Sequence, residues 1–140
     1  LDMGVDETTI SHVVDIILNI SFKGENESNK IKTKEGMIVQ DADRLDAIGA
    51  IGIARCFTYG GSKGKVIYNP KESYQKDMGK EDYVKIALNN KGSSINHFYE
   101  KLLLLKDRMN TPAGKKLAEE RHFFMEKYLD QFYKEWEGKS

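Results

Sequence analysis

The sequence predicts an all-α protein that folds as one helical domain over residues 1–140. Apolar residues recur at spacings of three and four over four long stretches, which is the spacing that places side chains on one face of a helix. Residues that favour the start of a helix stand at the beginning of three of these stretches. The one strand-like run, from Lys65 to Tyr68, is short.

Composition excludes several classes of protein. The chain has 140 residues, of which 39% are hydrophobic and 31% charged, a composition that fits one compact domain. Its 22 basic and 22 acidic residues cancel, which argues against binding nucleic acid by bulk electrostatics. Cys56 is the only cysteine, so no intramolecular disulfide can form and we expect a cytoplasmic protein. The apolar runs are far shorter than the roughly 20 residues that span a bilayer, so no membrane association is expected.

The first helix is expected from about Glu7 to Ser21. Its apolar residues are Ile10, Val13, Val14, Ile17 and Ile20, and Asp6 stands where it can cap the helix. The polar residues from Lys23 to Lys34 show no period and predict a connecting loop.

A second, buried helix is expected from Lys34 to about Tyr59. Its small residues, among them Gly49 and Gly52, would let a neighbouring helix approach closely. Each glycine inside a helix costs about 1 kcal/mol relative to alanine, so close packing or a functional contact should offset them. The turn Gly60–Lys65 ends this helix, and an irregular stretch with a possible short helix at Glu81–Leu88 follows to about Gly92.

Two further helices are expected at the end of the chain, from Ser94 to about Met109 and from Pro112 to about Trp136. Ser94 and Thr111 suit the capping positions, and Pro112 suits the first turn. The last helix carries an aromatic stripe, which predicts core packing or a dimer face: Phe124, Tyr128, Phe132 and Trp136.

The second predicted helix contains three acids in a run of six residues: Asp41, Asp43 and Asp46. On one continuous helix Arg44 and Arg55 would return to nearly the same angle, so a row of arginines would stand beside the carboxylates. A carboxylate that holds a divalent cation next to an arginine suits the hydrolysis of phosphate esters. An ion-pair network between helices would use the same residues, and the spacing leaves both interpretations open.

The residues around these acids resemble a known family. The stretch from Ile38 to Arg55, followed by Phe57, Tyr59, Gly60 and Gly61, closely resembles bacterial HD-domain phosphohydrolases. A second match begins with Asn96-His97-Phe98-Tyr99-Glu100-Lys101-Leu102 and continues through Lys106-Asp107, Met109-Asn110-Thr111, Ala118-Glu119 and Arg121 to Glu135-Trp136. The resemblance covers nearly the whole chain and implies an HD-domain-like helical bundle.

The resemblance also implies a metal centre. In that superfamily a divalent metal is held by a histidine, a His-Asp pair and a final aspartate, which resembles Asp43 here, with Asp41 as the alternative. None of the three histidines in this chain is followed by aspartate. We therefore expect that the chain is the C-terminal part of the domain, that the other ligands precede Leu1, and that the chain alone is inactive and exposes apolar surface. The metal is expected to be manganese, magnesium, iron, cobalt or nickel.

The expected reaction is metal-dependent hydrolysis of a phosphorylated small molecule. A nucleotide is the expected substrate, because the resembling subgroup includes proteins that look like nucleoside triphosphate pyrophosphohydrolases. Asp43 and Arg44 would be catalytic, and Arg44, Arg55, His97 and Lys101 would bind the substrate. Asp41 and Asp46 would orient the arginines or nearby waters.

Several alternatives stay open. His97 and Lys101 would otherwise serve packing or capping. Lys63 and Lys65 are further candidates for a phosphate contact, although their spacing matches no phosphate-loop motif. The rival function is a non-catalytic helical binding, regulatory or self-association module, and a homo-oligomer is compatible with either function.

Overall fold

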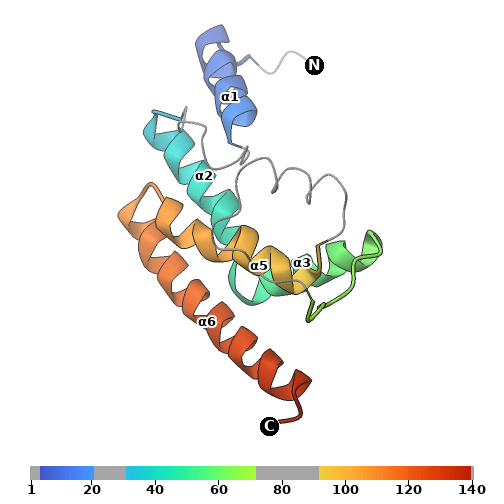
Figure 1. The fold of residues 1–140 in the computed structure, drawn as a ribbon. Coiled ribbons are helices and arrows are strands. Elements are labelled where there is room, and N and C mark those ends of the chain that lie inside the picture. The colour runs from blue at the N-terminus through green and yellow to red at the C-terminus, as the bar shows by residue number, and fades with distance from the viewer. Residues whose placement is uncertain (1–3, 21–30, 72–91, 140) are drawn as a thin grey trace.

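A computed structural model of the chain describes residues 4–20, 31–71 and 92–139. In these ranges the chain forms α1 (Glu7–Asn19), α2 (Lys34–Asp46), α3 (Gly49–Ser62), α5 (Ser94–Glu100), the 3-10 helix η1 (Leu102–Arg108) and α6 (Pro112–Trp136) (Figure 1). No strand occurs within these ranges, so the predicted all-α class is confirmed. The short helix predicted at Glu81–Leu88 and most of the loop predicted from Lys23 to Lys34 lie outside them.

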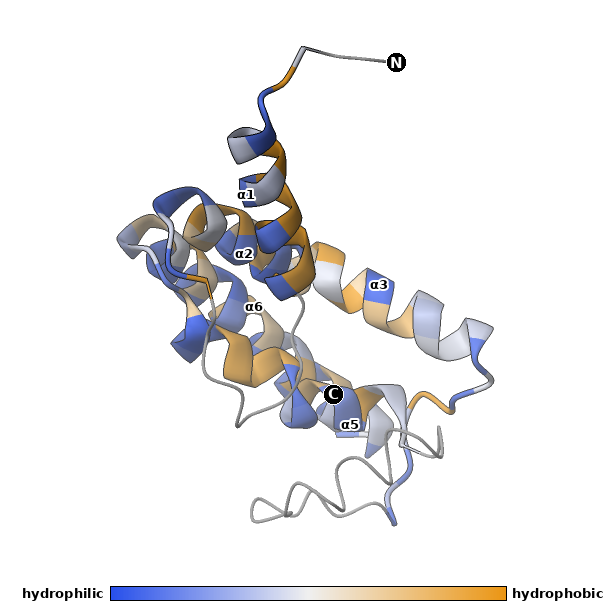
Figure 2. Ribbon diagram, turned by 90° about the horizontal axis from the view of Figure 1, so that it is seen from above, coloured by the Kyte–Doolittle hydropathy of each residue, from blue (hydrophilic) through white to orange (hydrophobic). Residues whose placement is uncertain are grey.

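Helix α1 begins at the predicted residue, Glu7, and most of its apolar side chains are not covered by other helices in the described ranges. The Asp6 carboxylate accepts a hydrogen bond of 2.9 Å from the Thr9 backbone N–H and caps the helix. Of its apolar residues Ile16 is buried, whereas most of the others are exposed: Ile10, Val13, Val14, Ile17 and Leu18. Figure 2 shows hydrophobic colouring along α1, which projects from the other helices. The prediction that the chain exposes apolar surface is confirmed.

The second predicted helix is wrong in one respect, because the chain breaks into α2 and α3. Ile48 is extended, with φ −125° and ψ 169°, and Gly49 has φ +75°, a conformation that favours glycine. A Cβ atom at position 49 would lie 3.0 Å from Cγ of Arg121. Gly49 therefore serves a sharp break between helices as well as close packing. Arg44 and Arg55 lie on different helices, so the predicted row of arginines is also wrong.

The helix predicted from Ser94 to Met109 also changes form within its length. Helix α5 ends at Glu100, Lys101 has φ −142° and ψ −56°, and the chain continues as η1. The cap is Ser93 and not Ser94, since Oγ of Ser93 accepts a hydrogen bond of 3.2 Å from the Asn96 N–H. The run from Lys65 to Tyr68 forms no strand, although Val66 O and Ile67 O accept hydrogen bonds from the N–H groups of Ser94 and Ile95.

Helix α6 has the predicted bounds and organises the core. Oγ1 of Thr111 accepts a hydrogen bond of 3.0 Å from the Gly114 N–H, which confirms Thr111 as the cap. The helix packs on α2, α3 and η1, and the buried core joins residues from α3 to α6: Ile48, Ile53, Ile95, Phe98, Leu102, Leu105, Met109, Ala118, Met125 and Leu129. Each large apolar side chain buried there contributes about 1.5–3 kcal/mol to the free energy of unfolding.

The aromatic stripe on α6 divides between the core and the surface. Tyr128 and Phe132 pack against the core, and the Tyr128 ring stacks on Phe98 with ring centroids 6.1 Å apart. Phe124 and Trp136 are about half exposed. Core packing is thus confirmed for the middle of the stripe. None of the helices in the described ranges has the length and the apolar character needed to cross a membrane.

Candidate functional site

Asp41 on α2 joins that helix to the start of α6. Its side chain is buried, and its two oxygens accept four hydrogen bonds from two residues. The backbone and side-chain nitrogens of Asn110 donate to Oδ1 at 2.7 and 2.9 Å. The backbone nitrogen and the hydroxyl of Thr111 donate to Oδ2 at 2.8 and 2.7 Å. Asp41 therefore serves the junction before α6, where the N-terminal helix dipole also favours a negative charge.

The charge state of Asp41 follows from these contacts. Burial alone would raise the pKa of the carboxyl group, but the hydrogen bonds from Asn110 and Thr111 outweigh it and hold the pKa below its ordinary value. Both oxygens of Asp41 are committed to this junction. Asp43 is the more accessible acid for a metal ion, since its side chain is exposed whereas that of Asp41 is buried.

Two predicted cationic residues lie within electrostatic reach of Asp43. Burial lowers the pKa of Lys101, and the negative charge of Asp43 opposes that shift. Burial also lowers the pKa of Arg44, with Arg108 acting in the same direction and Asp41 and Asp43 in the opposite one. Arg44 donates a hydrogen bond to the Arg108 carbonyl, which fixes its guanidinium beside η1. The structure thus brings Asp43, Arg44 and Lys101 together.

A groove of about 800 Å³ lies beside this group, between α3, α5 and the start of η1. Arg55, Lys65, His97 and Lys101 line it together with small and apolar residues. No Asp or Glu stands among the described residues that line it. Its lining charge is therefore positive, and three of the four predicted substrate-binding residues reach it. Arg44 and Asp43 do not line the groove, and Lys101 is the residue that links it to them.

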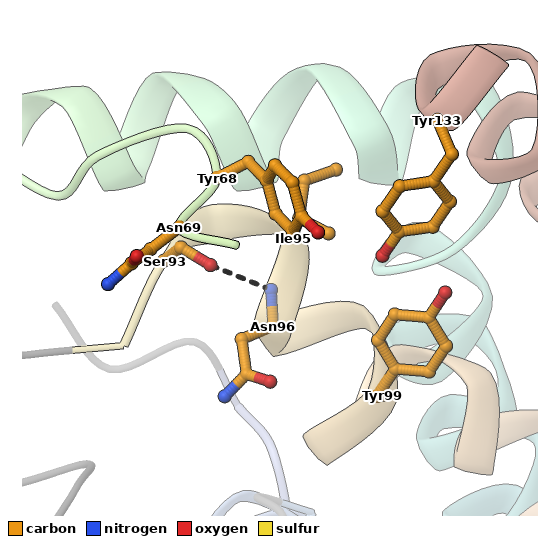
Figure 3. A pocket seen from close by; sticks show the side chains of 7 residues that line it. All are labelled: Tyr68, Asn69, Ser93, Ile95, Asn96, Tyr99 and Tyr133. Atoms are coloured by element: carbon orange, nitrogen blue, oxygen red, sulfur yellow. Dashed lines mark hydrogen bonds between the residues drawn. The ribbon is translucent and has the colours of Figure 1, made fainter. Parts of the chain in front are cut away.

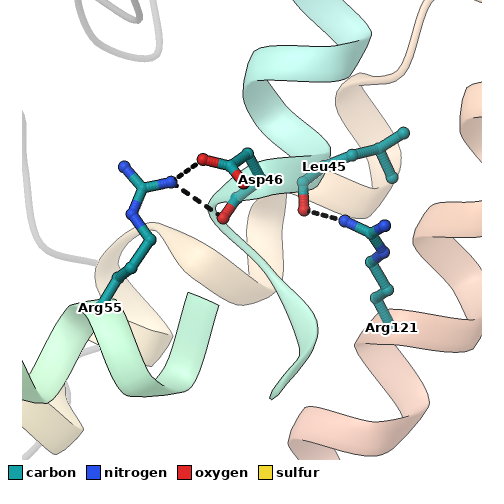
Figure 4. Close-up of polar contacts among 4 residues, drawn as sticks. All are labelled: Leu45, Asp46, Arg55 and Arg121. Atoms are coloured by element: carbon teal, nitrogen blue, oxygen red, sulfur yellow. Dashed lines mark hydrogen bonds and ion pairs between the residues drawn. The ribbon is translucent and has the colours of Figure 1, made fainter. Parts of the chain in front are cut away.

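Acidic residues lie next to two of the side chains that line the groove, Arg55 and His97. Arg55 forms an ion pair with the Asp46 carboxylate and also donates a hydrogen bond of 3.0 Å to the Asp46 carbonyl (Figure 4). Both side chains are more than half exposed, so the pair adds at most about 1 kcal/mol to stability. Nδ1 of His97 lies 3.8 Å from a Glu100 oxygen. Figure 4 also shows Arg121 donating to the Leu45 carbonyl, which ties α6 to the end of α2.

The sequence did not predict the shape of the groove. Gly60 allows α3 to approach Ser94 closely, because a Cβ atom at position 60 would lie 2.2 Å from Oγ of Ser94. The sequence predicts that Gly60 begins the turn that ends the helix, whereas Gly60 lies inside α3. Cys56 also lines the groove, donates to the Ser94 carbonyl at 3.5 Å, and has its pKa raised by burial to about 11. It is therefore a neutral thiol at physiological pH.

The predicted metal centre is not complete in the described part of the chain. Across residues 4–20, 31–71 and 92–139, no three His, Cys, Asp or Glu side chains gather closely enough to hold a metal ion. Asp43 fits the role of a single carboxylate ligand, because it is exposed and has an oxygen-donor side chain that hard divalent cations prefer. The described residues thus provide one candidate ligand and not a full set.

The chain is similar to several known proteins, although no protein-family model matches it. It is 40% identical over 136 residues to YpgQ, an uncharacterized protein of Bacillus subtilis, covering 96% of this chain and 57% of YpgQ. A crystal structure described as an HD-superfamily hydrolase from Bacillus thuringiensis is 46% identical, with a TM-score of 0.70, over 97% of this chain and 57% of that one.

Two further solved structures are similar. A protein from Lactobacillus plantarum is 41% identical with a TM-score of 0.79, covering 96% of this chain and 62% of that one. YpgQ in complex with ADP is 38% identical with a TM-score of 0.70, covering 98% of this chain and 60% of that one. The chain spans less than two thirds of the length of each of these relatives. The likenesses confirm an HD-like helical bundle and support the HD-like family.

Proposed function

We propose that this chain, which has the helical fold of an HD-superfamily hydrolase, forms the C-terminal part of a metal-dependent phosphohydrolase that acts on a nucleotide. The observation that carries the proposal is the positively charged groove beside Asp43. Arg55, Lys65, His97 and Lys101 line it without an acid among the described lining residues. Such a groove suits an anion with several charges, and it would repel a cationic substrate.

The chain's own cationic residues would act mainly by neutralising the negative charge of the phosphate. The Lys101 ammonium is partly removed from water, and its attraction to a phosphate oxygen is stronger there than at an exposed site. Arg44 is fixed by the Arg108 carbonyl, so its remaining N–H groups are positioned without a large loss of side-chain freedom. Together they would neutralise the negative charge that develops on a phosphate during cleavage.

Asp43 is the residue of this chain that we propose as a metal ligand. A divalent cation, with manganese, magnesium, iron, cobalt and nickel as candidates, would supply the charge that lowers the pKa of a bound water. The remaining ligands would come from a part of the protein other than the described residues. A nucleotide substrate is proposed because the similar protein YpgQ has been crystallised with ADP. A cytoplasmic location stays a prediction.

The direct test uses the longest natural form of the protein. Phosphate and pyrophosphate release is measured from a panel of nucleoside triphosphates with added manganese, and bound metal is measured by mass spectrometry. Asp43→Asn should lower kcat/KM at least about 100-fold and lower the metal content, since even supporting residues of a metal site are worth about 10- to 100-fold. Asp130→Asn, an exposed acid on α6, is the matched control.

Two outcomes would count against the proposal. One is an unchanged metal content and rate in Asp43→Asn, and the other is an equal loss in Asp130→Asn. Lys101→Met tests the groove separately, because loss of a partly buried cation should raise KM for a triphosphate at least about tenfold. The 140-residue chain by itself should release no phosphate above background in the same assay.

One observation favours a second function, a non-catalytic self-association module. The apolar face of α1 is exposed, with Ile17 and Leu18 both more than 60% accessible. A helix of 13 residues is only marginally stable in water without a packing partner. Sedimentation of the chain over a range of concentrations separates the two functions, since a module requires a concentration-dependent oligomer that Ile17→Lys disrupts.

A further inference from the structure

A second cavity of about 260 Å³ lies next to the segment that begins α5 (Figure 3). It shares no described lining residue with the charged groove. Ser94 faces the groove, whereas its neighbours Ser93 and Ile95 line the cavity. Three tyrosines are among the residues that line it, Tyr68, Tyr99 and Tyr133, and none of the described lining residues carries a charged side chain.

Hydrogen bonds and ring contacts hold the walls of this cavity in place. Backbone hydrogen bonds of 3.0 Å join Ser94 to Val66 and Ile95 to Ile67, which fixes the strand-like segment that carries Tyr68. The Tyr68 ring meets the rings of three aromatic residues on α6 edge to face, with centroids 5.2–5.8 Å apart: Phe132, Tyr133 and Trp136. The cavity is therefore preformed, which lowers the entropic cost of binding.

Polar side chains line the cavity, and contacts with neighbouring residues orient some of them. Glu100 accepts a hydrogen bond from Nδ2 of Asn96, which orients the amide, and Oδ1 of Asn96 accepts none from the described residues. Burial, followed by a hydrogen bond with Tyr99, raises the pKa of the Tyr133 hydroxyl, so that group stays neutral at physiological pH. Figure 3 shows the Tyr99 and Tyr133 hydroxyls facing one another beside Asn96. The site offers a hydrogen-bond acceptor and phenolic groups next to aromatic walls.

We propose that this cavity binds a neutral, planar heterocycle of the size of a nucleobase. Its volume is below the roughly 300–1,000 Å³ of pockets that hold drug-sized ligands, so it suits a single small ring system. Aromatic side chains bind the faces of such rings. An asparagine amide matches a donor and an acceptor on the edge of a base, and Oδ1 of Asn96 would accept from an exocyclic amine. The proposal does not rest on the hydrolytic function.

The test uses the 140-residue chain with adenosine and uridine as probes, because neither carries a phosphate. Heteronuclear NMR titration should give saturable shifts at Asn96, Tyr99 and Tyr68 and none at Arg55 or Lys65. Asn96→Ala should weaken binding roughly 2- to 10-fold, the value of one neutral hydrogen bond. Tyr99→Phe should do so by a similar factor, while Lys101→Met, in the groove, should leave nucleoside binding unchanged.

The outcomes separate this proposal from the hydrolytic one. The absence of saturable shifts up to about 10 mM nucleoside, a limit far weaker than specific recognition, would overturn the second site. Shifts confined to Arg55 and Lys65 would also overturn it, since they would place the ring in the groove. The wild-type titration decides the question even where a variant fails to fold. Inorganic phosphate is titrated in parallel, and its shifts at Lys101 test the groove alone.

Discussion

The substitution Asp41→Asn should remove much of the stability of the α2–α6 junction. Asp41 is 3% exposed, and its four hydrogen bonds hold Thr111, the cap of α6, and Asn110, the residue before the cap. An asparagine has the same shape, but in both orientations of its amide the NH₂ group would face hydrogen-bond donors. Either Asn110 or Thr111 would then lose its acceptor, and two donors would be brought together.

The magnitude follows from those contacts. Hydrogen bonds to a charged group contribute about 1.5–3 kcal/mol, and a buried donor left without a partner costs about 1–3 kcal/mol. Asparagine keeps one acceptor oxygen, so part of the network survives. We expect the free energy of unfolding to fall by about 2–4 kcal/mol, which would be a large fraction of the stability of a domain of this size.

The matched control is Asp43→Asn, two residues further along the same helix. Asp43 is exposed and should change the free energy of unfolding by no more than about 0.5 kcal/mol. Both variants are unfolded in urea and followed by circular dichroism at 222 nm, with the slope of the transition compared as well as its midpoint. Equal losses in the two variants, or a loss below about 0.5 kcal/mol in Asp41→Asn, would refute the assignment of Asp41 to the junction.

Three further predictions concern stability. Gly114→Ala should lower the free energy of unfolding by about 1–3 kcal/mol, because the new Cβ would lie 2.4 Å from the immobilised Oδ2 of Asp41. Gly61→Ala is the control and should raise the free energy of unfolding by up to about 1 kcal/mol, because a Cβ there would meet no atom within 4 Å. Urea titrations in which both variants changed stability in the same direction would contradict this prediction. Gly49→Ala should cost about 1–2 kcal/mol in thermal unfolding, since alanine is strained at φ +75°; an unchanged midpoint would exclude the strained break. The folded pKa of Asp41 lies below its ordinary value of 3.8, so the stability it contributes is present above that pH and is lost as the pH falls through the folded pKa. The difference between wild type and Asp41→Asn in urea should therefore be constant from pH 7 to about 5 and shrink at lower pH; a difference that grew on acidification would have the wrong sign.

Local signals predicted the ends of some helices well. Thr111 and Pro112 mark the start of α6, and the apolar period carries it to Trp136 without a residue that interrupts it. Asp6 marks the start of α1 in the same way. These starts depend on a side chain and a backbone N–H three residues away, so the sequence contains the whole interaction.

The breaks inside two predicted helices have no clear local signal in the sequence. Gly49 fits the pattern of a packing glycine, and the sequence shows neither its positive φ nor the side chain of Arg121 on α6 that lies against it. Lys101 belongs to a helix-forming segment, and its unusual backbone angles arise where α5 turns into η1. For the same reason the separation of Arg44 from Arg55, and with it the shape of the groove, could not be predicted from periodicity.

The spacing of Asp41 and Asp43 explains how one short motif provides two kinds of carboxylate. Successive residues of an α-helix are about 100° apart around the helix axis, so residues i and i+2, such as Asp41 and Asp43, are about 200° apart. One acid of the pair must therefore face away from the other. Asp41 faces the start of α6, where hydrogen bonds from N–H groups and a hydroxyl lower its pKa by more than burial raises it. Asp43 faces away from that junction and lies within electrostatic reach of Lys101. The buried acid fixes the orientation of α2, and that orientation determines where the exposed acid lies beside the groove. Substitution of Asp41 should thus disturb any function of Asp43, whereas the reverse effect on the fold should be small.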